Sequence, residues 1–121
     1  MDKYKAKVLS IGEMVQDLLE QGIVALFDST APKELQEIAV VHTGGTLMAD
    51  VAQGDSIILG DSAYTVTAVG EIANKNLKII GHVCLKFDAR SSPELPGDIH
   101  LKGEQLPQFA VGDVITIKAA V

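Results

Sequence analysis

The stretch "DSIILGDSAYTVTAVG", residues 55–70, decides the fold class. It begins with an apolar run at 57–59, continues through the turn-forming sequence Gly60-Asp61-Ser62, and then alternates apolar and polar residues up to position 69. Alternation with a period of two is typical of a strand with one buried face, and two such runs joined by turn residues predict a β-hairpin. We therefore expect strands to build the core of this protein.

Further strands are expected along the whole chain. Apolar or alternating runs of strand length lie at residues 3–11, 22–27, 38–41, 81–88, 97–103 and 112–121. Three strands follow a Gly-Asp pair, in which the glycine can adopt a positive φ and the aspartate can accept a backbone hydrogen bond. The segments "QGDSIIL" (53–59) and "VGDVITI" (111–117) share this start and an isoleucine at the same offset, which fits either a duplication or the same turn chemistry used twice. The expected fold class is mainly β, a compact antiparallel β-barrel with two short helices.

The first predicted helix covers residues 10–22, where apolar side chains recur at helical spacing. Ser10 and Glu13 fit a capping box at its start. Gly22 fits the stop position at its end, because glycine readily adopts the left-handed conformation there.

The second predicted helix covers residues 30–38, with Ser29 or Thr30 as its N-cap. Leu35 and Ile38 are expected to face the interior. Residues 70–81, "GEIANKNLKIIG", fit either a single helical turn or a broad loop, and the pattern does not decide between the two.

Composition bounds the function. The chain has 121 residues, which suits a single domain over residues 1–121. Its net charge of −6 and its five aromatic residues argue against nucleic-acid binding. The single cysteine, Cys84, excludes a disulfide framework and suits a cytoplasmic location. No stretch resembles a signal peptide or a membrane span, and no motif predicts a cofactor.

His42 is the strongest candidate for chemistry. In "IAVVHTGG", residues 38–45, it follows an apolar run that predicts a buried strand, and Thr43, Gly44 and Gly45 come next. A rigid strand would hold the ring in place, and consecutive backbone N–H groups in a glycine-rich turn can bind an anion. A nucleophilic imidazole beside such donors suits phosphoryl transfer to nitrogen. The alternative is a structural histidine beside an ordinary turn.

The other candidates carry weaker signals. His82 and His100 share a polar strand face with Lys86 and Lys102, so they are expected to be solvated unless one of them lies beside His42. The three histidines lack the short spacings of a zinc site, so we expect no metal. Arg90, the only arginine, lies in the loop "FDARSSPELPG" and is a further candidate for contact with a phosphoryl group or an acidic partner.

The chain resembles the glucitol/sorbitol-specific IIA component of the phosphoenolpyruvate-dependent sugar phosphotransferase system. The resemblance rests on "VVHTGG", "YTVTAVG", "NLKIIGHVCLKFD" and "LPGDIHLKG", which occur in this order over the last two thirds of the sequence. It implies a cytoplasmic phosphocarrier, a phosphotransferase component with a phosphohistidine at His42. Thr43, Gly44, Gly45 and His82 are the candidates for stabilising the phosphoryl group.

The resemblance also implies the partners. The histidine-containing phosphocarrier protein would donate the phosphoryl group, and the sorbitol-specific IIB component of the IIB/IIC membrane proteins would accept it during sugar uptake. Such a role calls for an exposed nucleophile on a rigid scaffold. An edge strand near either terminus would allow pairing with a second copy as a homodimer. The competing hypothesis is a non-catalytic β-barrel binding module in which His42 is structural.

Overall fold

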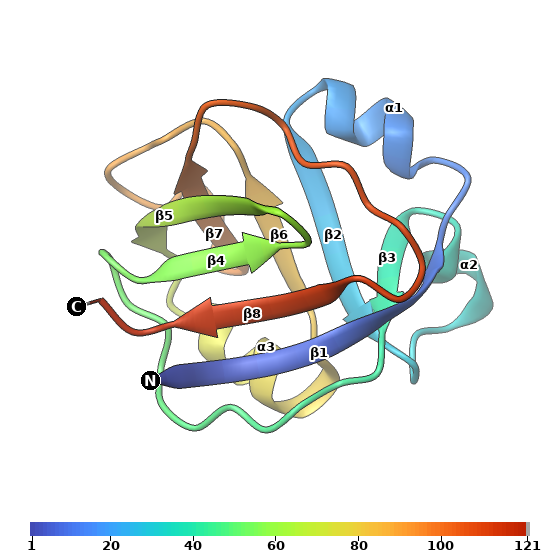
Figure 1. The fold of residues 1–121 in the computed structure, drawn as a ribbon, viewed down its shortest axis with the longest axis horizontal. Coiled ribbons are helices and arrows are strands. Elements are labelled where there is room, and N and C mark those ends of the chain that lie inside the picture. Colours follow the sequence, from blue (N-terminus) through green and yellow to red (C-terminus); the bar gives the residue numbers. More distant parts are fainter. Residues whose placement is uncertain (121) are drawn as a thin grey trace.

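The computed structural model describes residues 1–120. Eight strands close into a barrel in the order β1-β3-β2-β6-β7-β5-β4-β8, and three short helices flank it (Figure 1). The strands are β1 (Asp2–Ile11), β2 (Ile23–Asp28), β3 (Ala39–His42), β4 (Ser56–Leu59), β5 (Ser62–Val69), β6 (Val83–Lys86), β7 (Asp98–Lys102) and β8 (Val114–Lys118). The helices are α1 (Val15–Glu20), α2 (Lys33–Gln36) and α3 (Ala73–Ile80).

The predicted mainly-β barrel is confirmed. The hairpin at residues 55–70 is the β4–β5 pair, and Gly60 turns it with a φ of 61°. Six neighbouring strand pairs are antiparallel, whereas β2–β3 and β6–β7 are parallel. A parallel pair needs a long crossover, and here α2 and residues 87–97 supply the two crossovers.

The helix predictions are partly wrong. Ser10 lies in β1, where it pairs with Val41, so the expected capping box does not form, and α1 has no side-chain cap. Gly22, with a φ of 79°, does follow the end of α1. The stretch 70–81, for which two alternatives stood, contains the two-turn helix α3, and Gly81 ends it in the left-handed conformation.

The second helix also differs from expectation. Pro32 is its N-cap residue, so neither Ser29 nor Thr30 caps it. Leu35 and Ile38 are 37% and 38% exposed, and they do not face the interior as predicted. A helix of four residues has only one turn, which does not define a buried face through side-chain periodicity.

Closure of the barrel removes the expected edge strands. β1 pairs with both β3 and β8, and β8 pairs with both β1 and β4. Figure 1 shows these two strands side by side, with the two chain ends near each other. Within residues 1–120 the barrel therefore offers no free strand edge for the terminal pairing on which the homodimer expectation rested.

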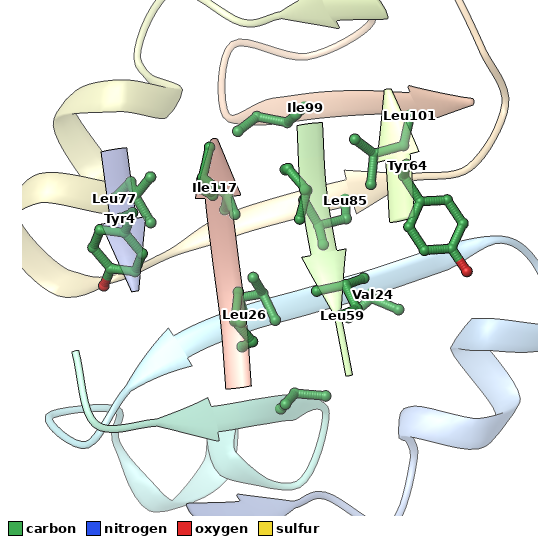
Figure 2. Packing of buried hydrophobic residues seen from close by; sticks show 14 of the residues in the cluster. Tyr4, Val24, Leu26, Leu59, Tyr64, Leu77, Leu85, Ile99, Leu101 and Ile117 are labelled. Atoms are coloured by element: carbon green, nitrogen blue, oxygen red, sulfur yellow. The ribbon is translucent and has the colours of Figure 1, made fainter. Parts of the chain in front are cut away.

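The interior is filled by aliphatic side chains from every strand and from α1 and α3. Figure 2 shows part of this cluster, including Leu26, Leu59, Leu85 and Ile117, with Tyr4 and Tyr64 on opposite sides of it. Each of these residues is at most 3% exposed. Burial of this apolar surface is the main stabilising term of the fold.

The barrel consists of two related halves, residues 2–59 and 62–118. The β1–β3 and β5–β7 pairs carry a register shift at the same place, between Val8 and Ser10 in one half and between Val66 and Ala68 in the other. The parallel pairs β2–β3 and β6–β7 also correspond, and the halves meet through β2–β6, β4–β5, β4–β8 and β1–β8.

The turns before β4 and β8 repeat as well. Gly54 and Gly112 have φ values of 96° and 95°. Asp55 accepts a hydrogen bond from the N–H of Ala52, and Asp113 accepts one from Ala110. The duplication suggested by "QGDSIIL" and "VGDVITI" therefore extends to the register of the strands and the conformation of the turns.

Candidate functional site

His42 ends β3 on the inner face of the barrel. It pairs with Val8, a core residue, and directly opposed residues of antiparallel strands point to the same face. The side chain is completely buried, with 0% of its surface exposed. The expectation of a ring open to solvent is therefore wrong, because the sequence pattern did not reveal which face of β3 the histidine occupies.

Both ring nitrogens of His42 are hydrogen-bonded to backbone groups. Nε2 lies 2.8 Å from the carbonyl oxygen of Gly81, and the N–H of Gly44 donates to Nδ1 over 3.0 Å. A carbonyl oxygen only accepts and an N–H only donates, so the neutral ring carries its proton on Nε2 and its lone pair on Nδ1. The fold thereby selects one tautomer.

Burial also keeps the ring neutral. It lowers the pKa of His42 below the ordinary value of 6.5, and this effect exceeds the opposing influences of the Gly81 carbonyl and Asp28. Tyr4 packs edge-on against the ring, with 6.1 Å between centroids. Burial, with a contribution from Asp28, raises the pKa of Tyr4 to about 12, so this neighbour is uncharged at neutral pH.

Asp28 is a site residue that the sequence interpretation missed. It ends β2 and is the register partner of His42 in the parallel β2–β3 pair. A Cβ placed on Gly81 would lie 2.6 Å from Cε1 of His42 and 2.8 Å from Cβ of Asp28, so these three residues are in close contact. The available signal was that Asp28, like His42, is the first polar residue after an apolar run.

The residues after His42 form its cover. The N–H of Thr43 donates to the carbonyl oxygen of Lys7 over 2.9 Å, and its hydroxyl accepts from the N–H of Lys7. Gly44 has a φ of 76° and contributes the N–H that caps Nδ1. Thr43 and Gly45 are exposed and Gly44 is half-buried. The backbone donors at Thr43 and Gly44 are thus engaged within the protein.

His82 follows Gly81 directly, but its ring is held by other partners. Nδ1 lies 2.9 Å from the carbonyl oxygen of Leu26, and the ring stacks on Phe27 with 4.5 Å between centroids. The side chain is half-buried. His82 therefore lies next in sequence to a hydrogen-bond partner of His42, with its own ring packed against β2.

His100 is far from solvated, contrary to expectation. It is 0% exposed, its Nδ1 lies 2.7 Å from Asp88, and its Nε2 accepts a hydrogen bond from the N–H of Glu94. Arg90, in the same loop, donates from Nε to the carbonyl oxygen of Ser92. These contacts hold residues 88–94 onto the outside of β7, and they indicate a structural role for His100.

Comparison of the two halves shows what is particular about the site. His42 pairs with Val8 next to the register shift of β1, and Leu101 pairs with Val66 next to the shift of β5. His42 therefore occupies the position that Leu101, a core residue, holds in the other half. Asp28 is the register partner of His42 in the β2–β3 pair. In the β6–β7 pair the register Lys86–His100, continued by one residue, places Phe87 opposite Leu101, so Phe87 corresponds to Asp28.

The segment that follows His42 is one residue longer than the segment that follows Leu101. Gly45 and Gly103 both lack room for a side chain, against Lys5 in one half and Tyr64 in the other. Two residues separate His42 from Gly45, but only Lys102 separates Leu101 from Gly103. The additional residue, Gly44, is the one whose N–H binds the imidazole.

Two further features of residues 1–120 concern metal binding and membrane spans. No three His, Cys, Asp or Glu side chains in this part of the chain are grouped so that they could hold a metal ion. None of its helices is long and apolar enough to span a bilayer.

Comparisons with known proteins agree with one another. Residues 3–116 match the family model of the PTS system glucitol/sorbitol-specific IIA component. The chain is 34% identical to the PTS system glucitol/sorbitol-specific EIIA components of Shigella flexneri and of Escherichia coli (strain K12), over 96% of this chain and 94% of each relative.

A solved structure extends the agreement to the fold. The crystal structure of a PTS system IIA component from Enterococcus faecalis V583 superimposes with a TM-score of 0.83 and 30% identity, covering 95% of this chain and 99% of that one. This chain therefore belongs to the glucitol/sorbitol-specific IIA family and is a phosphocarrier component of the sugar phosphotransferase system.

Proposed function

We propose that Nδ1 of His42 carries the phosphoryl group. The strongest support comes from comparing the two halves. His42 occupies the inward position that Leu101 occupies in the second half, and its ring makes two hydrogen bonds to backbone groups. A fold that accepts leucine at this position has no structural need for an imidazole. The presence of an imidazole here supports a chemical role.

The tautomer suits a nucleophile. With the proton of Nε2 directed to the Gly81 carbonyl, Nδ1 keeps its lone pair, and the lowered pKa keeps the ring unprotonated at neutral pH. The lone pair attacks the phosphorus of the donor's phosphohistidine, and the donor N–P bond breaks with its electron pair returning to the donor ring. No proton has to move.

The turn at Thr43, Gly44 and Gly45 must open before the reaction, since the Gly44 N–H occupies Nδ1 in the closed state. Glycine has wide backbone freedom, so two adjacent glycines make such a movement inexpensive. After transfer, the N–H of Gly44 would donate to a phosphoryl oxygen instead of Nδ1. The N–H of Gly45 would supply a further donor from the same turn, and Thr43 its hydroxyl, since the Thr43 N–H is bonded to Lys7.

We further propose that the histidine-containing phosphocarrier protein donates the group and that the sorbitol-specific IIB component, with IIC in the membrane, receives it. Membership of the family supports interaction with other components of this system. A cytoplasmic location fits this exchange, as does a lone free cysteine, Cys84.

His82 is the second candidate acceptor. Its ring is half-buried, whereas that of His42 is fully buried, and its Nδ1 is held by the Leu26 carbonyl, which leaves the lone pair on Nε2. The two candidates thus predict phosphorylation at different atoms, Nδ1 of His42 or Nε2 of His82. If His82 only assists His42, its replacement by glutamine should slow transfer without preventing it.

The test uses the purified protein with phosphoenolpyruvate, the general phosphotransfer enzyme and the histidine-containing carrier. Wild-type protein should gain one acid-labile phosphoryl group, and His42→Gln should gain none, while His82→Gln should still be labelled. NMR of the phosphorylated ring identifies the nitrogen, with Nδ1 expected. Full labelling of His42→Gln, or loss of labelling only in His82→Gln, would contradict the assignment to His42.

A further inference from the structure

Asp28 stands at the centre of the contacts that hold the His42 ring. It is the register partner of His42 and lies against Gly81, whose carbonyl binds Nε2. A Cβ placed on Gly44 would lie 3.6 Å from Cβ of Asp28 and 3.9 Å from its Oδ2. Asp28 is thus adjacent to both backbone groups that bind the imidazole.

The carboxylate of Asp28 is fixed by its own turn. Oδ1 accepts hydrogen bonds from the N–H and the hydroxyl of Thr30. These bonds orient the carboxylate, and the second oxygen, Oδ2, faces the Gly44 turn. The ring nitrogens of His42 bond to Gly81 and Gly44, so Asp28 acts on the ring through its charge.

The fold itself does not require a carboxylate at this position. The corresponding residue of the other half, Phe87, packs against the core and lies edge-on to Tyr64 with 5.0 Å between centroids. An apolar side chain therefore closes that end of the barrel. At the other end a half-buried carboxylate stands beside a buried ring.

Phosphorylation explains why a negative charge is useful here. When Nδ1 forms its bond to phosphorus, Nε2 keeps its proton and still donates it to the Gly81 carbonyl oxygen, so the positive charge of the donor ring passes to the His42 ring. A buried site disfavours that charge, and a neighbouring carboxylate offsets the penalty. Of the titratable side chains that act on or contact this ring, Tyr4 is neutral at pH 7 and Asp28 supplies the negative charge.

We propose that Asp28 is a positioning residue that provides the counter-charge for the phosphorylated ring of His42. This inference rests on the proposed role of His42. It assigns Asp28 no bond to the phosphoryl group, because the carboxylate would repel it. The residue acts through the imidazole, whose cationic form it stabilises.

The test compares Asp28→Asn with Asp88→Asn. The asparagine oxygen can still accept from Thr30, so the turn is retained while the charge is lost. Asp88 is a matched control: it follows β6 and accepts from the N–H of Arg90 two residues on, and its replacement changes the net charge equally. Its Oδ1 also binds Nδ1 of His100, a contact that an asparagine oxygen can still accept. We expect the initial rate of phosphorylation to fall about tenfold in Asp28→Asn and less than about twofold in Asp88→Asn.

A second measurement is independent of phosphotransfer. NMR titration of the unphosphorylated proteins should show the pKa of the His42 imidazole lower in Asp28→Asn than in wild type, and unchanged in Asp88→Asn. Because the signal comes from folded molecules, it is informative even where a variant is less stable. A merely structural role for Asp28 would leave this pKa in place.

The outcomes separate the two proposals. If His42→Gln is unlabelled and Asp28→Asn matches wild type in both rate and His42 pKa, the inference about Asp28 is overturned and the role of His42 stands. If His42→Gln is labelled normally, both are overturned. A slower Asp28→Asn with a lowered His42 pKa, and an unaffected Asp88→Asn, is the result we expect.

Discussion

The two ends of the barrel are built by corresponding residues, yet they differ in chemistry. In the second half, Leu101, Phe87 and Tyr64 form an apolar closure, with the aromatic rings in edge-on contact. In the first half, His42 and Asp28 replace Leu101 and Phe87 beside Tyr4. One scaffold thus carries an apolar core at one end and a polar cluster at the other, which separates the residues that we propose for function from those that the fold needs.

The largest expected change in stability comes from placing a histidine at the apolar end of the barrel, in the position of Leu101. Leu101→His removes a buried aliphatic side chain and introduces two ring nitrogens where the second half has no counterpart of Gly44. We expect a loss of about 3 kcal/mol or more in the free energy of unfolding. Urea denaturation measures this. A loss below about 1 kcal/mol would show that either end accepts an imidazole.

Gly81→Ala should have the next largest effect. The new Cβ would lie 2.6 Å from Cε1 of His42, and the residue has a φ of 61°. Gly22, in the corresponding place after α1, is the control, since it has a φ of 79° and no atom within 4 Å of the point that a Cβ would occupy. We expect about 1 kcal/mol of destabilisation for Gly22→Ala from backbone strain and at least about 2 kcal/mol for Gly81→Ala. Equal losses in the free energy of unfolding for the two variants, measured by urea denaturation, would mean that the His42 ring moves aside at no cost.

His42→Leu should change stability little. It places at the polar end the residue that the other end contains, and the burial of an aliphatic side chain offsets the loss of two hydrogen bonds from Gly44 and to Gly81. We expect a change below about 2 kcal/mol in either direction, together with complete loss of phosphoryl uptake. Strong destabilisation by thermal or urea unfolding would instead indicate that His42 is needed for the fold.

The smallest expected effect is a difference in pH dependence. The pKa of His42 is lowered in the folded protein, so the unfolded chain binds a proton at His42 more readily. Wild type should therefore lose stability relative to His42→Leu as the pH falls below about 6.5, by at most about 1.4 kcal/mol per pH unit. Unfolding curves between pH 5 and pH 8 measure the difference. Parallel curves for the two proteins would contradict the lowered pKa.

Local patterns predicted the strands well. The hairpin at β4–β5 followed from apolar alternation around Gly60, and the Gly-Asp starts of β4 and β8 followed from turn chemistry. These features depend on neighbouring residues alone. The helix starts were predicted poorly. Ser10 could either cap α1 or extend β1, and in the barrel it extends β1 and pairs with Val41.

The candidate site was predicted in part. His42 was singled out because it follows an apolar run and precedes two glycines, and the structure places Gly44 on its ring. Asp28 was missed, since a parallel β2–β3 pair brings it to His42 and local pattern does not reveal strand order. His100 was misread as solvated, because the residues 88–94 that cover it come from a loop without a regular pattern.

The sequence alone determined the mainly-β class, the positions of most strands and the family to which the chain is similar, and it pointed to His42, which we propose as the phosphoryl carrier. The tertiary structure decided that this histidine lies inside the barrel, which nitrogen holds its proton, and that Asp28 stands beside it. The reason is physical. Strand-forming tendency and turn chemistry act over a few residues, whereas burial, tautomer and counter-charge are set by groups that only barrel closure brings together.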